Sequence, residues 1–498
     1  MRTAISALCS SSVLLLAGSL AAQEEEDAAL KPQVMREPGH VVDVIDAFDD
    51  DNGDPFDIAV TLGFEYFSKR ARILRESSVF APGLTTGGYT SKLQNVGEYI
   101  ETTSKLTPRL DIGVFKDLAV FARIPIVLSN SRRIDPIDGS DGNQPAVLQG
   151  APGEQLFTLP FEAPDRSGVE YVAIGVDFGI FNQARDRTKP TWVIGFEARI
   201  RAGEEMHPCN ENPPAGQVKC AHEGDIDRNG DSTNPDAQLA PLEAVDAEEQ
   251  DAGVTRGTVG LELHTLMSKR LKYIEPYGGF NALFEFRQGG SGFNVTDLEG
   301  ALVNHPPYVG TVLVGMMIHP WENREAFQRI TLDVRFQGEY HSEGRDYGEL
   351  FDALGSSPAR SLRTPKWARF TETPTARSVV DQSSEKIYYT GLSVVEAYGS
   401  YRAAGSVTWR AGQYVRLSSG VGLRFDQAHG ITHDQPCNPD FKDNLGEAGP
   451  CHSGSEGNEV ATGIPNPAYR PSVNAIGRRF YVDESITYEI FASGLVMF

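Results

Sequence analysis

The sequence has no long apolar run after its first 25 residues. A transmembrane helix needs about 20 consecutive, mostly apolar residues, so a bundle of membrane helices is excluded. Positive charge is also scarce, because 45 Lys and Arg stand against 68 Asp and Glu, a formal net charge of −23. Proteins that bind nucleic acid carry basic surfaces, so nucleic acid is excluded as a partner.

The N-terminus predicts export from the cytoplasm. Arg2 supplies a positive charge, residues 12–20 form an apolar stretch, and Ala21 and Ala22 provide small residues for cleavage. These three features together are typical of a secretory signal peptide. We therefore expect residues 1–22 to be removed from the mature protein.

Cysteine is rare, with 5 in the whole chain, and Cys9 lies inside the expected signal peptide. The other four form two close pairs, Cys209 with Cys220 and Cys437 with Cys451. An exported chain meets an oxidising compartment, so two local disulfides are expected among three possible connectivities. The sequences HPC at 207–209 and CAH at 220–222 also contain a zinc-ligand set, which is the alternative for the first pair.

Apolar and polar residues alternate along the rest of the chain. In 329–340, for example, Leu332 and Val334 alternate with Asp333 and Arg335. A period of two predicts β-strands with one apolar face and one polar face. About twelve segments show it: 57–66, 100–114, 118–128, 172–180, 192–201, 256–267, 275–287, 308–319, 329–340, 395–410, 415–426 and 484–498.

The last segment, ESITYEIFASGLVMF at 484–498, ends on the aromatic Phe498. It resembles the C-terminal strand of bacterial outer-membrane β-barrels, and the resemblance implies recognition by the barrel-assembly machinery. The connections also alternate between short and long, as in such barrels when both ends of the chain are periplasmic. The short connections are 116–117, 183–190, 269–273, 320–328 and 411–413, and the long ones are 69–95, 129–168, 202–254, 288–307, 342–390 and 427–483.

The fold class predicted from these patterns is all-β: a closed antiparallel transmembrane β-barrel of about 12 strands, with long extracellular loops and short periplasmic turns. A soluble β-sandwich also alternates. Long strands, aromatic residues near strand ends and the loop asymmetry favour the barrel, whose closed sheet leaves no unpaired backbone in lipid. The expected location is the bacterial outer membrane, with outer-membrane lipid and lipopolysaccharide as partners.

This interpretation divides the chain into three parts. Residues 1–22 are the signal peptide, and residues 57–498 are the barrel. Residues 23–56 contain the acidic runs EEED and DDDNGD with little periodicity, so we expect an acidic periplasmic extension rather than a plug.

If the apolar faces touch lipid, the polar faces line the lumen. Two interpretations stay open: a wall of mutually satisfied ion pairs, or a basic strip that attracts anionic solutes, because charged rings set pore selectivity. Residues 402–424 are rich in Arg with few acids, which favours a local basic strip. The candidate lumen residues are Arg109, Arg123, Arg199, Arg335, Arg402, Arg416, Arg424, Glu197, Asp333 and Glu339.

One long loop carries a candidate cation site. The spacing in DIDRNGDSTNPD at 225–236 resembles the EF-hand calcium loop, with Gly230 at the sharp turn. The loop departs from that pattern because it has Pro235, no helical flanks and Asp rather than Glu at the last position. Calcium is the predicted cofactor, and an acidic surface loop is the alternative. The candidate ligands are Asp225, Asp227, Asn229, Asp231 and Asp236.

A catalytic site would require a nucleophile, a base and a group that orients the base, and no such motif is present. We therefore expect a porin-like channel for small hydrophilic solutes, with an anion preference set by lumenal Arg. A fold does not determine a function. A non-conducting surface-binding or structural barrel with a calcium loop, and an outer-membrane hydrolase, are the alternatives.

Overall fold

The computed structural model describes most of the barrel and much of the loops. The predicted signal peptide (1–22) and the predicted extension (23–56) lie outside the described residues and stay predictions. The described residues are 58–81, 88–115, 117–137, 146–183, 186–213, 218–220, 250–288, 292–293, 298, 300–367, 370–372, 378–380, 386–412, 414–438, 452–453, 460–461 and 464–498.

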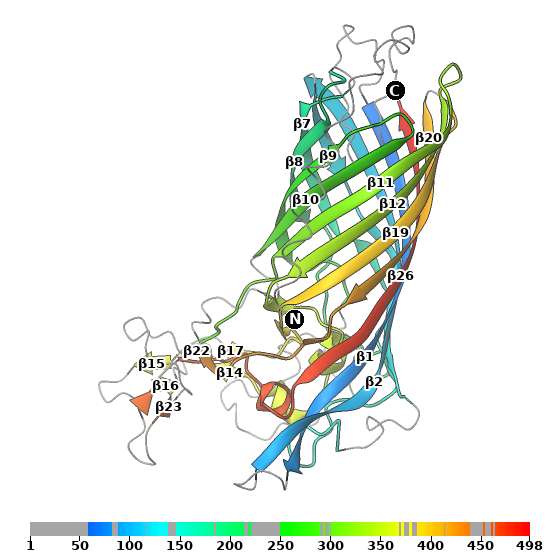
Figure 1. Ribbon diagram of the computed structural model, residues 1–498. Helices are drawn as coiled ribbons and strands as arrows, with labels where there is room; N and C mark the ends of the chain where they lie inside the picture. The colour runs from blue at the N-terminus through cyan, green and yellow to red at the C-terminus, as the bar shows by residue number, and fades with distance from the viewer. Residues whose placement is uncertain are drawn as a thin grey trace.

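Within these residues, twelve antiparallel strands close into a barrel, as the sequence predicted (Figure 1). The sheet closes because β1 pairs with β2 on one side and with β26 on the other. The strands are β1 (Ile58–Ala81), β2 (Gly88–Phe115), β3 (Leu118–Arg123) continued by β4 (Ile126–Asp135), β7 (Tyr171–Phe181), β8 (Thr191–Arg201), β9 (Thr258–Ser268), β10 (Ile274–Arg287), β11 (Val309–Asn323), β12 (Gln328–His341), β19 (Tyr398–Arg410), β20 (Val415–Asp426) and β26 (Phe480–Met497).

The apolar faces of the strands point outward and the charged faces point inward. In β12, Val334 is 47% exposed whereas the neighbouring Asp333 is 5% exposed. In a sandwich the apolar side chains would be the buried ones, so that alternative is excluded. Exposed aromatic residues lie near both ends of the strands, as in membrane barrels. One set is Tyr66, Tyr308, Tyr340, Tyr401 and Tyr488, and the other is Phe115, Tyr273, Trp321, Trp409, Tyr414 and Phe498.

The predicted asymmetry of the connections is confirmed. The short turns at 116–117, 182–190, 269–273, 324–327 and 411–414 share one end of the barrel with the C-terminus (Figure 1). The long connections lie at the opposite end. In outer-membrane barrels the short turns are periplasmic and the long loops extracellular.

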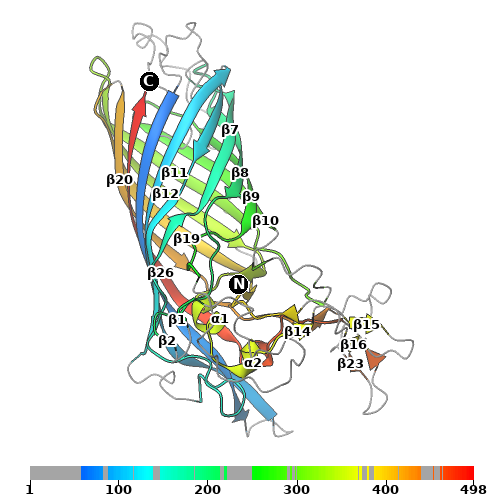
Figure 2. The same ribbon diagram turned by 180° about the vertical axis from the view of Figure 1, so that it is seen from behind.

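Two details of the strand prediction were wrong. The predicted loop 69–95 is mostly strand, because β1 continues to Ala81 and β2 begins at Gly88, so this hairpin extends beyond the rest of the barrel (Figure 2). The predicted strand 118–128 is interrupted between β3 and β4, where Pro125 has no N–H to donate. Neither change alters which face of a strand is apolar.

The long connections lie at the extracellular end (Figure 1), and we call them the cap (146–165, 342–397 and 427–479 where described). Its core joins loop residues to the inner faces of the extended strands. Each large apolar side chain buried there contributes about 1.5–3 kcal/mol, which holds the loops as one body. The core includes Ile73, Val96, Tyr99, Ile134, Leu156, Phe157, Leu350, Leu354, Leu362, Val473 and Phe480.

The remaining elements are short and belong to the cap and its neighbouring loops. Among the described residues, no helix is long and apolar enough to cross a membrane. These elements are β5 (Phe161–Glu162), β6 (Arg166–Val169), β13 (Gly344–Asp346), α1 (Phe351–Gly355), α2 (Arg360–Arg363), β14 (Lys366–Trp367), β15 (Phe370–Glu372), β16 (Ser378–Val380), β17 (Lys386–Ile387), β18 (Ser393–Val395), β21 (His429–Gly430), β22 (Cys437–Asn438), β23 (His452–Ser453), β24 (Val460–Ala461), β25 (Ile464–Pro465) and α3 (Pro471–Asn474).

Candidate functional site in the barrel lumen

The first part of the lumen wall, on β3, β8 and β9, is a lattice of ion pairs. Glu197 accepts hydrogen bonds from Arg123 at 2.6 Å and from Arg199 at 2.7 Å, and Arg199 also contacts Glu262. The carboxylate of Glu197 is only 3% exposed. A buried carboxylate is stable when several donors satisfy it, so two arginines around one acid explain why this charge tolerates burial.

The lattice continues across β2, β7 and β9. Arg109 contacts Asp111 at 2.6 Å and Asp177 at 3.2 Å. Asp177 also lies 2.8 Å from the Nε2 atom of His264. The guanidinium carbon of Arg109 lies 4.0 Å from the ring centre of Phe121, a cation–π contact. Sequence alternation had placed these side chains on inward faces but could not pair them.

A second group of ion pairs lies on the opposite wall. Arg402 contacts Glu489 at 2.6 Å, and Arg424 contacts Glu339 at 3.0 Å and Asp426 at 3.1 Å. The predicted basic strip of residues 402–424 is therefore neutralised at these two arginines, because neighbouring strands supply the acids that the segment itself lacks. Both are better described by the predicted wall of ion pairs.

The remaining candidate lumen residues, Asp333, Arg335 and Arg416, lie in two different places. Arg335 contacts Asp333 at 2.8 Å, and Tyr277 donates a hydrogen bond to Asp333 at 2.6 Å. Arg416 is different, because its register neighbour on β19 is another arginine, Arg410. The structure thus joins most of the predicted residues into a lattice of ion pairs, and it places Arg416 beside Arg410.

Cavities lie between these groups of side chains. One of about 420 Å³ is lined by Arg402, Arg424, Glu339 and Glu489. A second, of about 250 Å³, is lined by Arg109, Arg123, Glu197 and Asp177, and both cavities share Gln337 as a wall. Tyr398 is shared between the first cavity and a third of about 300 Å³ that lies beneath the cap. The lumen therefore contains adjoining cavities of the size of small solutes; the first two are mainly polar, whereas the third is mainly apolar.

Residues 344–355 of the cap, which we call the inward loop, lie over the extracellular end of the lumen. Asp346 contacts Arg256, which precedes β9, at 2.8 Å, and Glu349 contacts Lys69 of β1 at 2.8 Å. Burial alone would raise the pKa of Glu349, but Lys69 and the nearby His429 together outweigh burial and hold that pKa below its ordinary value. Two acids of one loop are thus bound to two distant parts of the barrel wall.

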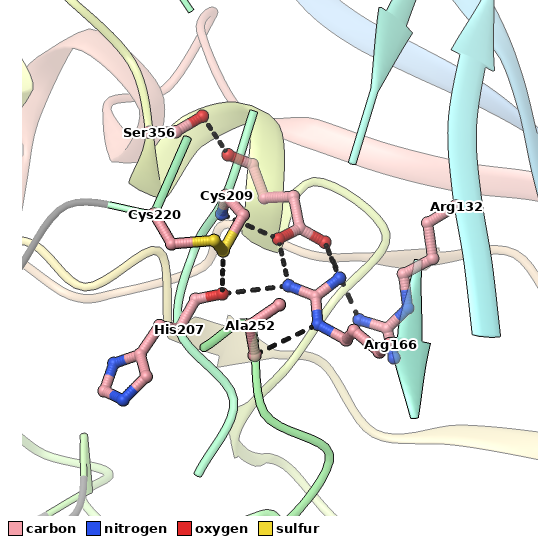
Figure 3. Close-up of a disulfide and its surroundings, with 8 residues drawn as sticks. Arg132, Arg166, His207, Cys209, Cys220, Ala252 and Ser356 are labelled. Carbon is pink, nitrogen blue, oxygen red and sulfur yellow. Dashed lines mark hydrogen bonds and ion pairs between the residues drawn. A yellow bond between two sulfur atoms is a disulfide. The ribbon is translucent and has the colours of Figure 1, made fainter. Parts of the chain in front are cut away.

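A third acid of the inward loop, Asp352, contacts residues that surround a disulfide. Figure 3 labels three of these contacting residues, Arg132, Arg166 and Cys209. Asp352 accepts hydrogen bonds from Arg166 at 2.6 and 3.2 Å and from the backbone N–H of Cys209 at 3.0 Å. Arg132 of β4 lies 3.8 Å away. The sequence analysis missed all three acids of this loop, whose spacing of three residues in DYGELFD was the available signal.

The Cys209–Cys220 disulfide is confirmed, with 4.4 Å between the two Cα atoms. The zinc alternative for this pair is therefore wrong. Arg166 also donates a hydrogen bond to the carbonyl oxygen of His207 at 2.9 Å, so the disulfide-linked segment and the inward loop share one arginine. The predicted partner of Cys437, Cys451, lies outside the described residues.

The candidate calcium ligands at 225–236 also lie outside the described residues, so this site stays a prediction. Elsewhere, in the part of the chain that the structure describes, no group of three or more His, Cys, Asp or Glu side chains is arranged to hold a metal ion.

A closed antiparallel sheet with an apolar exterior, aromatic residues near both strand ends and a charged interior defines a transmembrane β-barrel. The protein is a bacterial outer-membrane β-barrel, and it associates with membrane lipid through its exposed apolar faces.

The sequence matches no protein-family model and no curated protein. Solved structures that it is similar to include a FadL homologue of Pseudomonas aeruginosa, at 10% identity and a TM-score of 0.32, with 88% of this chain and 90% of that one covered. An outer membrane channel from Pseudomonas putida F1 has 10% identity and a TM-score of 0.30, with 93% and 100% covered. The outer membrane protease OmpT of Escherichia coli has 8% identity and a TM-score of 0.25, with 89% and 97% covered.

Proposed function

We propose that this protein is an outer-membrane channel for small hydrophilic solutes, and that the inward loop sets its aperture. The observation that carries the proposal is the attachment of this loop to the lumen wall. Its acids Asp346 and Glu349 bind Arg256 and Lys69, two basic residues at different places around the barrel. A loop fixed at several points narrows the mouth to a defined width.

The lumen chemistry supports a hydrophilic solute. Most side chains around the cavity of about 420 Å³ are charged or amide groups, such as Gln337, Arg402 and Glu489. A polar solute that sheds water in such a space regains hydrogen bonds from the wall, whereas an apolar solute does not. The same wall combines both signs of charge, so the charge preference of the channel depends on where residues of one sign are grouped together.

The anion preference is also part of this proposal. Arg402 and Arg424 are balanced by acids, so they contribute little net charge to the lumen. At the periplasmic end Arg416 lies beside Arg410, and this pair of like charges supports the preference. Rings of like charge in a pore attract the opposite ion and repel the like one.

Recordings from a planar bilayer test the function. We expect the purified protein to conduct in KCl, and the double variant Asp346→Asn with Glu349→Gln to show a larger unit conductance, because the loop loses two of its attachments. The control is Arg133→Gln, which removes a charge from an exposed ion pair with Asp135 outside the lumen. A wild-type protein that never conducts would refute the channel.

The absence of conductance would favour the non-conducting surface-binding barrel, because the lattice and the inward loop would then close the lumen. Protease and lipase assays on the same preparation would test the hydrolase. For the predicted calcium loop, we propose a cation site that is tested by calcium titration of the protein against a variant with Asp225 and Asp227 changed to Asn.

A further inference from the structure

Three rings stack face to face at the extracellular end of the lumen, and we call them the ring stack (His341, Tyr398 and His429). The rings of His341 and Tyr398, which are register partners on β12 and β19, have centres 4.4 Å apart and planes 2° apart. The ring of His429 lies 3.9 Å from that of Tyr398, with planes 9° apart. Two rings this close to Tyr398 would overlap if they shared one of its faces, so Tyr398 lies between the two imidazoles.

The ring stack ends at His341, beside the cavity of about 300 Å³ beneath the cap. Tyr398 covers the face of His341 on the side of β19, whereas β11 lies on the other side of β12. The register partner of His341 on β11 is Val309, and that of Val309 on β10 is Leu283. Register partners point to the same face of a sheet, with Cα atoms about 4.5–5.5 Å apart. Since all three residues line the cavity, the second face of the imidazole is directed at this space, next to two aliphatic side chains.

Polar groups also line this cavity. Arg256 contacts Asp346 of the inward loop at 2.8 Å and Glu285 of β10 at 3.0 Å. The hydroxyl of Thr258 donates a hydrogen bond to Glu285 at 2.8 Å. Gly260, the register partner of Glu285 on β9, has no side chain to fill the space. The cavity therefore offers hydrogen-bonding groups beside a mainly apolar wall, and a few placed polar groups are what orient a ligand in an apolar pocket.

We propose that this cavity binds a planar heteroaromatic solute, whose ring continues the ring stack on the second face of His341. Aromatic rings favour offset parallel stacking. A pure hydrocarbon would remove water from Asp346 and Glu285 without replacing its hydrogen bonds, which is unfavourable. Arg256 already pairs with both acids, so the ligand needs no charge of its own. The ligand class is therefore an uncharged ring with N–H and C=O groups on its edge, which is the chemistry of a nucleobase.

This inference deepens the proposed function and rests on it for one point, the entry of solutes into the lumen. It names a class of solute and puts its recognition at the extracellular mouth. Asp346 belongs to the inward loop and lines the cavity, so a bound ring contacts the loop that sets the aperture. Tyr398 also lines the cavity of about 420 Å³, so the site lies directly before the next space of the lumen.

The first measurement compares two probes, uracil and dihydrouracil, by ligand-observed NMR titration of the full-length protein in detergent. Both probes carry the same N–H and C=O groups, but the ring of dihydrouracil is puckered and not aromatic. We expect uracil to bind about two- to tenfold more tightly, because only a flat aromatic ring stacks on His341. Equal binding of the two probes, or no binding of either, would overturn the site.

Two variants locate the binding. Val309→Phe places a ring of the protein itself beside His341, so uracil binding should be lost; unchanged binding would overturn the site. His341→Leu covers failure of Val309→Phe to fold, and it should remove the preference for uracil over dihydrouracil; a retained preference would show that the ring does not stack there. The control is His305→Leu, which removes an imidazole stacked on Tyr308 at 4.9 Å, outside the cavity lining, and should bind both probes as the wild type does.

The second measurement distinguishes this site from the channel itself. In a planar bilayer, uracil added on the extracellular side should interrupt the KCl current of the wild type and leave that of Val309→Phe unchanged, because a bound ring obstructs the lumen. Uracil binding without any conductance would retain the site and refute only the channel. Conductance without uracil binding would retain the channel and overturn the site.

Discussion

The guanidinium group of Arg166 donates hydrogen bonds to both carboxylate oxygens of Asp352, across a sequence separation of 186 residues. The side chain of Arg166 is 0% exposed and that of Asp352 is 6% exposed. Removing one partner of a buried pair leaves an uncompensated charge, which costs about 3–5 kcal/mol. We expect Asp352→Ala to lower the stability of the cap by that amount, measured as faster hydrogen exchange in cap peptides.

The control for this prediction is an exposed ion pair on the same end of the molecule. Arg133 contacts Asp135 at 3.1 Å, but the two side chains are 49% and 35% exposed. Exposed pairs contribute about 0.2–1 kcal/mol, so Asp135→Ala should leave cap exchange nearly unchanged. Equal effects of the two substitutions would show that burial of the Arg166–Asp352 pair does not determine its contribution.

Reduction of the Cys209–Cys220 disulfide should loosen the same region. The bond closes a loop with a sequence separation of 11, and the backbone N–H of Cys209 donates to Asp352. Disulfides typically stabilise by about 2–4 kcal/mol. We expect the variant Cys209→Ser, Cys220→Ser to become sensitive to protease at the cap while the barrel keeps its heat-modifiable migration on gels. Unchanged cleavage at the cap would contradict this coupling.

Acid should release the inward loop. The pKa of Glu349 is held below its ordinary value of 4.5 in the folded protein, although burial acts in the opposite direction, because Lys69 lies 2.8 Å away. A carboxyl whose pKa is lowered by folding contributes stability above its unfolded pKa and loses it as pH falls through the folded pKa. We therefore expect the protection of 344–355 against hydrogen exchange, measured relative to the intrinsic exchange rate at each pH, to fall below about pH 4.5.

Glu349→Gln is the matched control for the acid response, because it keeps the shape of the side chain and cannot titrate. In this variant the loop should exchange faster at neutral pH and respond less to acid. If the wild-type response began and ended above pH 4.5, and if Glu349→Gln left it intact, the transition would belong to another group.

Much of the barrel could be predicted because the alternation of apolar and polar residues is visible within the sequence of each strand. Alternation such as Leu332–Asp333–Val334 indicates that the segment is a strand and which of its faces points outward, because a spanning strand meets lipid on one side and the lumen on the other. The extension of β1 to Ala81 was missed because there the strand leaves the membrane. Its residues no longer need an apolar outer face, so the pattern that marks a strand in lipid ends before the strand does.

The site was less predictable because it depends on contacts between distant segments. Alternation identified Arg123, Glu197 and Arg424 as inward residues, but pairing depends on the register between strands, which the pattern does not specify. The partners of Arg256 and Lys69 come from the inward loop, Asp346 and Glu349, and nothing in a loop sequence shows that it folds back over a barrel.

The outward facing of the apolar side chains can be tested at the middle of β12. Val334 is 47% exposed on the outer face, between Leu332 and Phe336 on the same side. An arginine at the centre of the lipid layer costs about 2–4 kcal/mol in a membrane barrel, so Val334→Arg should reduce heat-modifiable folded protein in the outer-membrane fraction. Leu302→Arg is the control, because Leu302 is 54% exposed in a connection outside the barrel strands and should assemble normally. If Val334→Arg assembled as well as Leu302→Arg, the apolar face of β12 would not be in contact with lipid.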